Sequence, residues 1–180
     1  MSYSTSGRLA LNNQRDNKIS RFRTWVLLAV PLAAIFFQVY VPQFVHFLSY
    51  LELPLLVVVY FALMRRSQIH GLLIGALVGL AQDSLLGTKN PLGMFGIVKT
   101  LVGYFAASVS VRFDVDNGLV RLFLAFFFFV FHQFFYWVMA RALLGQQVAF
   151  DLQQTLLIGL LNALVGVSLF HFLDKLRETV

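Results

Sequence analysis

The sequence predicts an all-α polytopic membrane protein, a bundle of six transmembrane helices. Three observations favour this fold class. Hydrophobic residues make up 59% of the 180 residues, and the mean hydropathy is +0.77. Charged residues are only 12%, too few for a water-soluble domain of this size. Apolar runs of the roughly 20 residues that cross a hydrocarbon core also recur along the chain. The expected spans are residues 24–45, 48–64, 69–86, 92–111, 119–142 and 155–173.

The segment before the first span is polar and basic. Residues 1–23 contain five of the fourteen Lys and Arg residues and no long apolar run, which predicts a disordered cytoplasmic tail. The apolar run that follows is too long for the core of a signal peptide and lacks a small-residue cleavage site, so we expect an uncleaved anchor. No linker divides the spans, which predicts one transmembrane domain over 24–173 and a short cytoplasmic C-terminus at 174–180.

The basic residues alternate between the two sides of this predicted topology. Outer segments carry only Lys89 and Arg141, and Lys99 lies within a span. Since basic loops stay in the cytoplasm, both termini are expected there, in a bacterial inner membrane. This placement accounts for the net charge of +6 without nucleic-acid binding. The absence of cysteine excludes disulfides, thiolate metal sites and cysteine nucleophiles. The expected cytoplasmic segments carry Arg8, Arg15, Lys18, Arg21, Arg23, Arg65, Arg66, Arg112, Arg121, Lys175 and Arg177.

Small residues recur at helical spacing in the third, fourth and sixth expected spans. Glycines four residues apart share one face of a helix and let a neighbouring helix approach closely. We therefore expect these three spans to form the tight interior of the bundle. The glycines predicted at helix contacts are Gly71, Gly75, Gly79, Gly96, Gly103, Gly159 and Gly166.

The fifth expected span is aromatic on every side, from Phe126 to Trp137. Two interpretations fit this pattern. The rings face lipid, with an interfacial belt near Tyr136 and Trp137, or they form a docking surface for a transmembrane helix of a partner.

Three ionisable residues lie within the outer third of the expected spans: Glu52, Asp83 and Lys99. Asp83 extends the glycine series of its helix by one step of four, and Lys99 lies between two glycines, so both should face the bundle interior. One interpretation is a fixed Lys99–Asp83 ion pair, with Glu52 sharing the ammonium. The other is an outward-facing polar cavity that binds a ligand or a partner.

The remaining polar residues indicate little chemistry. His132 is expected to be a hydrogen-bonded packing residue, since it stands alone among phenylalanines. Histidines and carboxylates lack metal-ligand spacing, Ser84 has no evident base, and no glycine-rich loop has phosphate-binding spacing. We therefore expect a protein that is not an enzyme, with no catalytic, cofactor or metal site.

An ordered set of features runs from Leu53 to Tyr104. It begins with Pro54 early in an apolar helix, then Tyr60, a short basic turn and the glycine-rich helix that Asp83 closes. It continues through Gly87, Pro91, Leu92, Gly93, Gly103 and Tyr104. With six spans, about 180 residues and a basic start, this segment resembles the rod shape-determining protein MreD family.

The resemblance implies a non-enzymatic integral scaffold of the bacterial elongation machinery, or elongasome. Such a scaffold partners an MreC-like bitopic membrane protein, acts in one complex with MreB, RodA and a class B penicillin-binding protein, and supports rod shape and lateral peptidoglycan synthesis. Membrane lipid is the other expected partner, and no nucleic acid is expected.

The family's fold is similar to that of the substrate-binding components of energy-coupling-factor transporters. This similarity supplies the alternative function, a substrate-capturing membrane subunit of a vitamin-type transporter. Ala29 and Ala33 in the first span have the four-residue spacing by which such subunits contact their transmembrane partner. An intramembrane enzyme is a third class, which turnover of a lipid-linked substrate would reveal.

Overall fold

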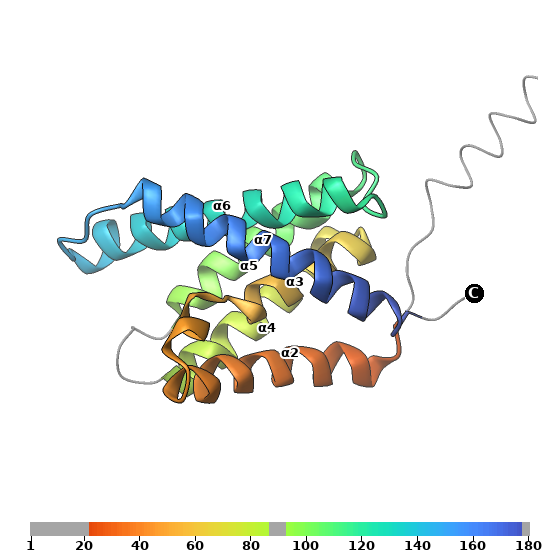
Figure 1. Cartoon of the computed structure of the whole chain (residues 1–180), viewed down its shortest axis with the longest axis horizontal. Coiled ribbons are helices and arrows are strands. Elements are labelled where there is room, and N and C mark those ends of the chain that lie inside the picture. The colour runs from red at the N-terminus through yellow and green to blue at the C-terminus, as the bar shows by residue number, and fades with distance from the viewer. Residues whose placement is uncertain (1–21, 87–92, 178–180) are drawn as a thin grey trace, which may run out of the picture.

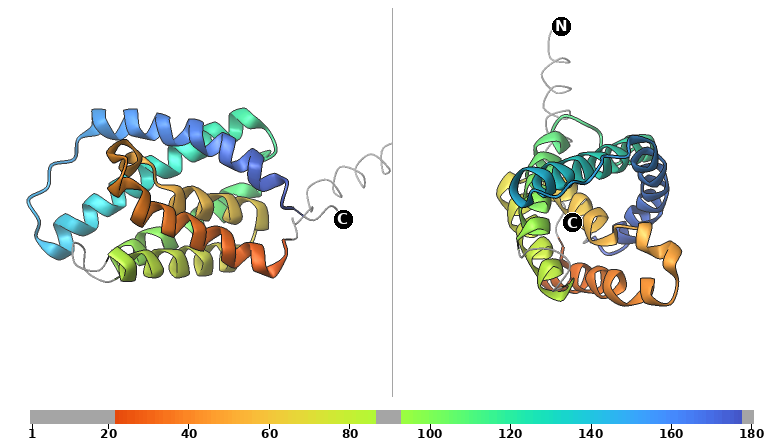
Figure 2. Two further views of the ribbon diagram at one scale, coloured as in Figure 1. Left: turned by 60° about the horizontal axis from the view of Figure 1, so that its bottom comes forward. Right: turned by 90° about the vertical axis from the view of Figure 1, so that its left-hand side faces the viewer.

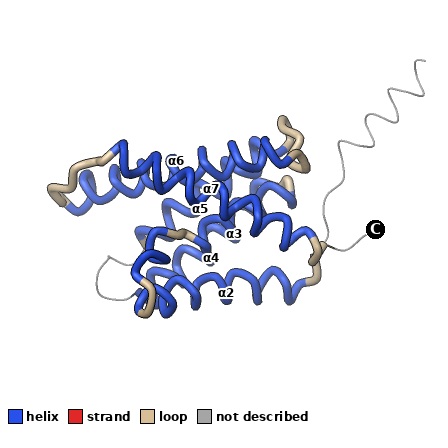
Figure 3. Tube along the Cα trace, viewed as in Figure 1, coloured by secondary structure: helices blue, strands red, loops and turns tan. Residues whose placement is uncertain are grey.

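The computed structural model describes residues 22–86 and 93–177, which form helices and connections with no strand among them (Figures 1 and 3). The expected N-terminal tail and the last three residues lie outside the described residues, apart from Phe22 and Arg23. The α-helices are α2 (Thr24–Tyr40), α3 (Leu53–Arg65), α4 (Gln68–Leu86), α5 (Met94–Ser110), α6 (Gly118–Leu144) and α7 (Leu152–Asp174). Two short 3₁₀ helices, η1 (Val41–Gln43) and η2 (His46–Tyr50), join α2 to α3.

Each expected span corresponds to one of these α-helices, with the largest difference between the first two. The first expected span, 24–45, is α-helical only to Tyr40, and residues 41–50 form η1 and η2. Pro42 in the first turn of η1 has no N–H to continue the ladder of α2. Pro54 lies in the first turn of α3, where a missing N–H costs nothing.

Within residues 22–86 and 93–177, four segments are long and apolar enough to cross a membrane: Trp25–Gln43, His46–Arg65, Gly118–Leu144 and Leu152–Asp174. The helix α5 is apolar but shorter, and α4 is interrupted by glycines and polar residues. The described structure is therefore that of a multi-pass helical membrane protein.

The centre of the bundle is α3, which packs against each of the other five α-helices. Seen along the bundle, α2, α4, α5, α6 and α7 surround it (Figure 2). Every residue from Pro54 to Met64 is buried, which explains why this helix is apolar on all sides. The expectation that the three glycine-rich spans form the interior is wrong in this respect. Those helices surround α3 and keep one face of large apolar residues exposed, as at Leu77 and Leu157.

The antiparallel helices α4 and α5 pack with their backbones in contact. A Cβ atom on Gly71 would overlap the carbonyl oxygen of Gly103, and one on Gly103 would overlap that of Gly71. A Cβ on Gly75 would lie 2.7 Å from the carbonyl carbon of Lys99. These distances leave no room for any side chain, so glycine is required at each of these positions of the contact.

Gly79 belongs to the same close backbone contact, and the glycines of α7 are less crowded. A Cβ on Gly79 would lie 2.6 Å from the Cα of Gly96, whereas one on Gly159 or Gly166 would lie 3.2 Å from the nearest side-chain atom. The contact of α7 with its neighbours is therefore close, but it is made by side chains rather than by backbones.

Consecutive helices run in opposite directions, which brings alternate connections to the same end of the bundle. Most of the described basic residues lie in or beside the connections at one end, so the two ends differ in charge. We call the end where α2 begins and α7 ends the basic end, because seven basic residues lie at or beside the helix ends found there. They are Arg23, Arg65, Arg66, Arg112, Arg121, Lys175 and Arg177. The basic end is on the right in Figure 1. The opposite end contains η1, η2 and the connection 145–151 between α6 and α7.

Candidate functional site

The side chain of Lys99 is fully buried in the half of the bundle toward the opposite end. Its Nζ lies 3.6 Å from Oε2 of Glu52 and 3.3 Å from Nε2 of His132. It also lies 4.4 Å from the centre of the Phe95 ring, one turn earlier in α5. Side chains in helices tilt toward the N-terminus, which directs this ammonium toward the opposite end. We call Lys99, Glu52 and His132 the Lys99 cluster; it draws on α5, the start of α3 and α6.

Glu52 is positioned by Asn162, a fully buried residue of α7. The backbone N–H of Glu52 donates to Oδ1 of Asn162 at 2.9 Å. The Asn162 amide nitrogen donates to the carbonyl oxygens of Tyr50 and Ile158, at 2.8 and 3.0 Å. The side chain of Asn162 therefore provides hydrogen-bond partners for backbone groups between η2 and α3. It also fixes the backbone position from which the Glu52 side chain extends toward Lys99.

The ring of His132 stacks on that of Phe95, with centroids 6.0 Å apart and planes 3° apart. An ammonium can only donate, so Nε2 of a neutral ring accepts from Lys99 and Nδ1 carries the hydrogen. Nδ1 of His132 and Oε2 of Glu52 are both buried and make no hydrogen bond within the described residues. The Lys99 cluster is therefore only partly satisfied, which makes its stability sensitive to the loss of any member.

Asp83 does not pair with Lys99, contrary to the first interpretation of the sequence. Its carboxylate accepts three backbone hydrogen bonds, from the N–H groups of Gly93 at 3.0 Å, Phe95 at 3.2 Å and Gly96 at 2.9 Å. These groups belong to the N-terminus of α5, whose first N–H groups have no partner within the helix. The negative charge is thus balanced by the positive end of a helix dipole, and Asp83 caps α5 from the neighbouring helix α4.

A second polar network lies at the basic end. Arg121, at the start of α6, pairs with Asp174 at the end of α7 and donates through Nε to the carbonyl oxygen of Val115 at 2.7 Å. The hydroxyl of Tyr60 on α3 donates to the same carboxylate of Asp174 at 2.9 Å. This network therefore links α3, α6 and α7 at one point.

Arg177 extends the network beyond the end of α7. Its guanidinium lies 3.1 Å from Oδ1 of Asp116 and 3.4 Å from Oδ1 of Asp174. Partial burial alone would lower the pKa of Arg177, but the hydrogen bond to Asp116 and the two carboxylates outweigh it and raise the pKa. The guanidinium therefore stays charged.

Sequence reasoning missed this network because it treated Arg121 and Arg177 only as indicators of topology. A signal was present: Asp116 and Asp174 stand close to these arginines in the sequence, at the ends of two consecutive expected spans. The expectation that His132 is a hydrogen-bonded packing residue is confirmed, although its partner Lys99 was not predicted. The positioning role of Asn162 was missed, although it is a polar residue inside an apolar run.

The geometry of the two polar networks supports a role in holding helices together more directly than a role in binding a metal ion or in catalysis. Within the part of the chain that the structure describes, no three His, Asp or Glu residues are placed to hold a metal ion. The charged groups of both networks join helices far apart in sequence. These contacts hold the bundle in one arrangement.

The comparison with known families gives a match over nearly the whole chain. The family model for the rod shape-determining protein MreD matches residues 19–179, nearly the whole chain, and so extends well beyond the Leu53–Tyr104 segment on which the resemblance rested. No curated protein and no solved structure gives a significant match. The family match and the long apolar helices agree on a multi-pass membrane protein concerned with cell shape. The chain belongs to the MreD family of rod shape-determining proteins.

Proposed function

We propose that this protein is a non-enzymatic scaffold of the bacterial inner membrane that partners an MreC-like bitopic protein. In this proposal it acts in the elongasome with MreB, RodA and a class B penicillin-binding protein, and supports lateral peptidoglycan synthesis. The family match over residues 19–179 carries the proposal. The two polar networks support it, because they fix helices relative to one another, as a docking platform requires.

The proposed topology has six spans with both termini in the cytoplasm. The 17 residues of α5 extend about 26 Å and the 19 residues of α4 about 28 Å, close to the roughly 30 Å of a hydrocarbon core. Their glycines and Asp83 are tolerable in a membrane because these groups face other helices rather than lipid. The seven described basic residues near one end support a cytoplasmic location for that end.

The exposed face of α6 is the candidate surface for either lipid or the partner's helix. Phe123, Phe127 and Phe134 lie on it and are between 44% and 59% exposed, while Phe128 and Phe129 pack inward. Both interpretations of this aromatic helix therefore concern the same three rings.

Copurification in mild detergent tests the scaffold role. We expect an MreC-like protein to be retained by the wild-type chain. A chain with Phe123, Phe127 and Phe134 replaced by Leu should retain less of it if the rings contact the partner, and the same amount if they contact lipid. A matched triple replacement of Leu72, Leu73 and Leu77 by Ile on the exposed face of α4 should change nothing. Failure of the wild-type chain to retain any MreC-like protein would contradict the proposal.

The transporter subunit remains the alternative because of one observation. Ala29 and Ala33 are both exposed on α2, where a second protein could approach the helix closely. Under this alternative the fold would be similar to that of energy-coupling-factor substrate-binding components, and the purified chain would retain a vitamin-type molecule. Mass spectrometry of the denatured protein separates the two functions, since the scaffold proposal predicts no such molecule.

A further inference from the structure

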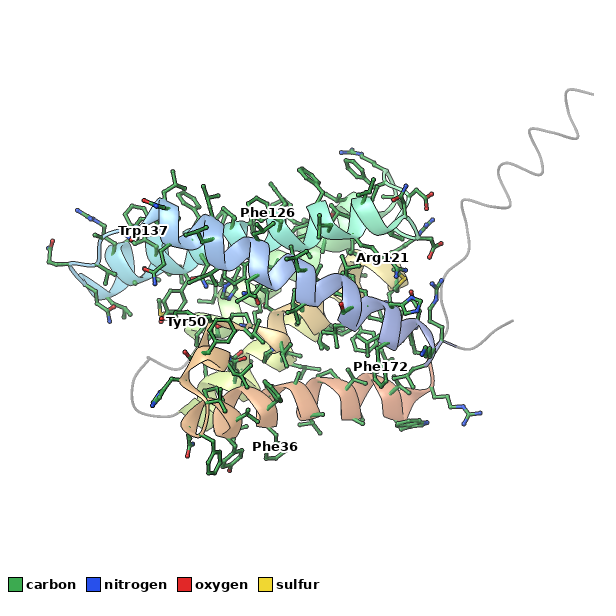
Figure 4. All side chains as sticks on the ribbon, in the orientation of Figure 1. Phe36, Tyr50, Arg121, Phe126, Trp137 and Phe172 are labelled. Carbon is green, nitrogen blue, oxygen red and sulfur yellow. The ribbon has the colours of Figure 1, made fainter. Side chains whose placement is uncertain are left out.

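A cavity of about 360 Å³ lies at the opposite end, between the last turns of α6, the start of α7 and Tyr50. Tyr50 and Trp137, which line it, lie in the same region of the structure in Figure 4. Its volume falls within the range of small-molecule sites, about 300–1,000 Å³. It is distinct from the Lys99 cluster, none of whose three residues lines it.

Aromatic rings form the walls of this cavity and are held in place. The indole N–H of Trp137 donates to the carbonyl oxygen of Val148 at 2.8 Å, and the indole ring lies 5.6 Å from that of Phe150. Tyr136 stacks on Phe95 at 5.1 Å. The ring faces are therefore present before any ligand binds, and such faces carry partial negative charge that attracts C–H groups.

The polar groups of the cavity are nearly all neutral. The side-chain amides of Gln133 and Gln154 line it and make no hydrogen bond to any described residue, so each offers two donors and an acceptor. Asp151 is the one charged residue among the described lining residues, and its Oδ1 already accepts from the backbone N–H of Gln154 at 2.9 Å. Among the described residues, neither Lys nor Arg lines the cavity, so these side chains offer no positive charge to compensate a phosphate or carboxylate ligand.

The cavity lies toward the outer edge of the expected hydrocarbon core. The 27 residues of α6 extend about 40 Å, roughly 10 Å more than a hydrocarbon core. In Figure 1 the α6–α7 connection reaches beyond the ends of α2 and α3 at the opposite end. Trp137 lies 16 residues beyond Arg121, about 24 Å along α6, so it lies just inside the outer edge of a core of roughly 30 Å. The end of α6 and the 145–151 connection extend past that edge, where water-soluble ligands have access.

We propose that this cavity binds an uncharged sugar unit. A sugar ring has an apolar C–H face that suits the aromatic walls and a rim of hydroxyls that both donate and accept, which suits the free amides. A peptide or an anionic headgroup matches fewer of these features. The proposal is independent of partner binding and stands whether or not the scaffold role is correct.

Tryptophan fluorescence of the full chain tests this inference. The chain contains two tryptophans, and Trp25→Phe leaves Trp137 as the only reporter. The protein is held in a detergent without a sugar headgroup, because a maltoside would compete. Maltose and N,N′-diacetylchitobiose are the probes, and sorbitol and inorganic phosphate are the controls. We expect a saturable change in Trp137 emission with at least one disaccharide and none with either control.

Two variants locate the binding. In the Trp25→Phe chain, the double replacement Gln133→Leu and Gln154→Leu should raise the Kd for the disaccharide about tenfold or more, because two hydrogen bonds are lost. Gln153→Leu, beside Gln154 but outside the cavity lining, should leave the Kd unchanged. Thermal unfolding of each variant confirms that it is folded. No saturable change, an equal response to sorbitol or phosphate, or equal effects of the cavity and control variants would overturn the proposal.

Discussion

Replacing Glu52 with Gln removes the carboxylate that faces the ammonium of Lys99. The side chain of Lys99 is fully buried, whereas that of Glu52 is 15% exposed, so the two partners do not tolerate isolation equally. Removing one partner of a buried pair costs about 3–5 kcal/mol. We expect Glu52→Gln to approach this cost, because it leaves a buried ammonium without the carboxylate that forms its ion pair. Lys99→Met should cost less, because the remaining carboxylate reaches water.

The coupling between the two residues gives the sharper test. The free energies of unfolding of the single variants and of the double variant, measured in the same detergent or lipid, form a double-mutant cycle. We expect a favourable coupling energy of about 1–3 kcal/mol for Glu52 with Lys99. For Asp83 with Lys99 we expect a smaller value, because Asp83 is engaged by three backbone N–H groups. A larger coupling of Lys99 to Asp83 than to Glu52 would refute the assignment of separate roles.

Three further predictions concern helix contacts, each measured as a change in thermal unfolding. Gly75→Ala should destabilise the bundle by about 1–3 kcal/mol, because the added Cβ overlaps the backbone at Lys99, whereas Gly118→Ala meets no atom within 4 Å and should be neutral. Asp83→Asn should cost about 1–2 kcal/mol by weakening the cap of α5, and Ser84→Ala on the exposed side of α4 should cost less. Asp174→Asn should cost about 1.5–3 kcal/mol by weakening its bonds to Arg121 and Tyr60, while Lys175→Met, at an exposed position, should have little effect. Equal effects of a variant and its control would argue against the contact in question.

The positions of the helices could be predicted from the sequence because apolar runs in membranes are set by bilayer thickness. The same depth reasoning placed Glu52 and Lys99 in the same third of the bundle, where the structure has them 3.6 Å apart. The central place of α3 could not be predicted in this way. All six helices are apolar, and hydropathy alone does not distinguish a helix surrounded by protein from one that faces lipid.

The role of Asp83 could not be predicted for a related reason. Helical spacing correctly directs it toward α5, but its partners depend on where α5 begins relative to α4. Because α5 begins at Met94, its N-terminal N–H groups lie within hydrogen-bond distance of the Asp83 carboxylate. The carboxylate therefore binds backbone N–H groups and not the side chain of Lys99. Contacts such as Tyr60 with Asp174, 114 residues apart in the chain, likewise depend on the order of helices around α3.

The shape of living cells tests the central claim most directly. In rod-shaped cells that have this chain as their sole MreD-family protein, its depletion is expected to give round cells. Re-expression of the Gly118→Ala chain should restore rods, and a Gly75→Leu chain, in which α4 and α5 cannot pack, should not. Cells that keep their rod shape on depletion, or rods restored equally by both variants, would contradict a shape-determining scaffold whose action depends on this helix packing.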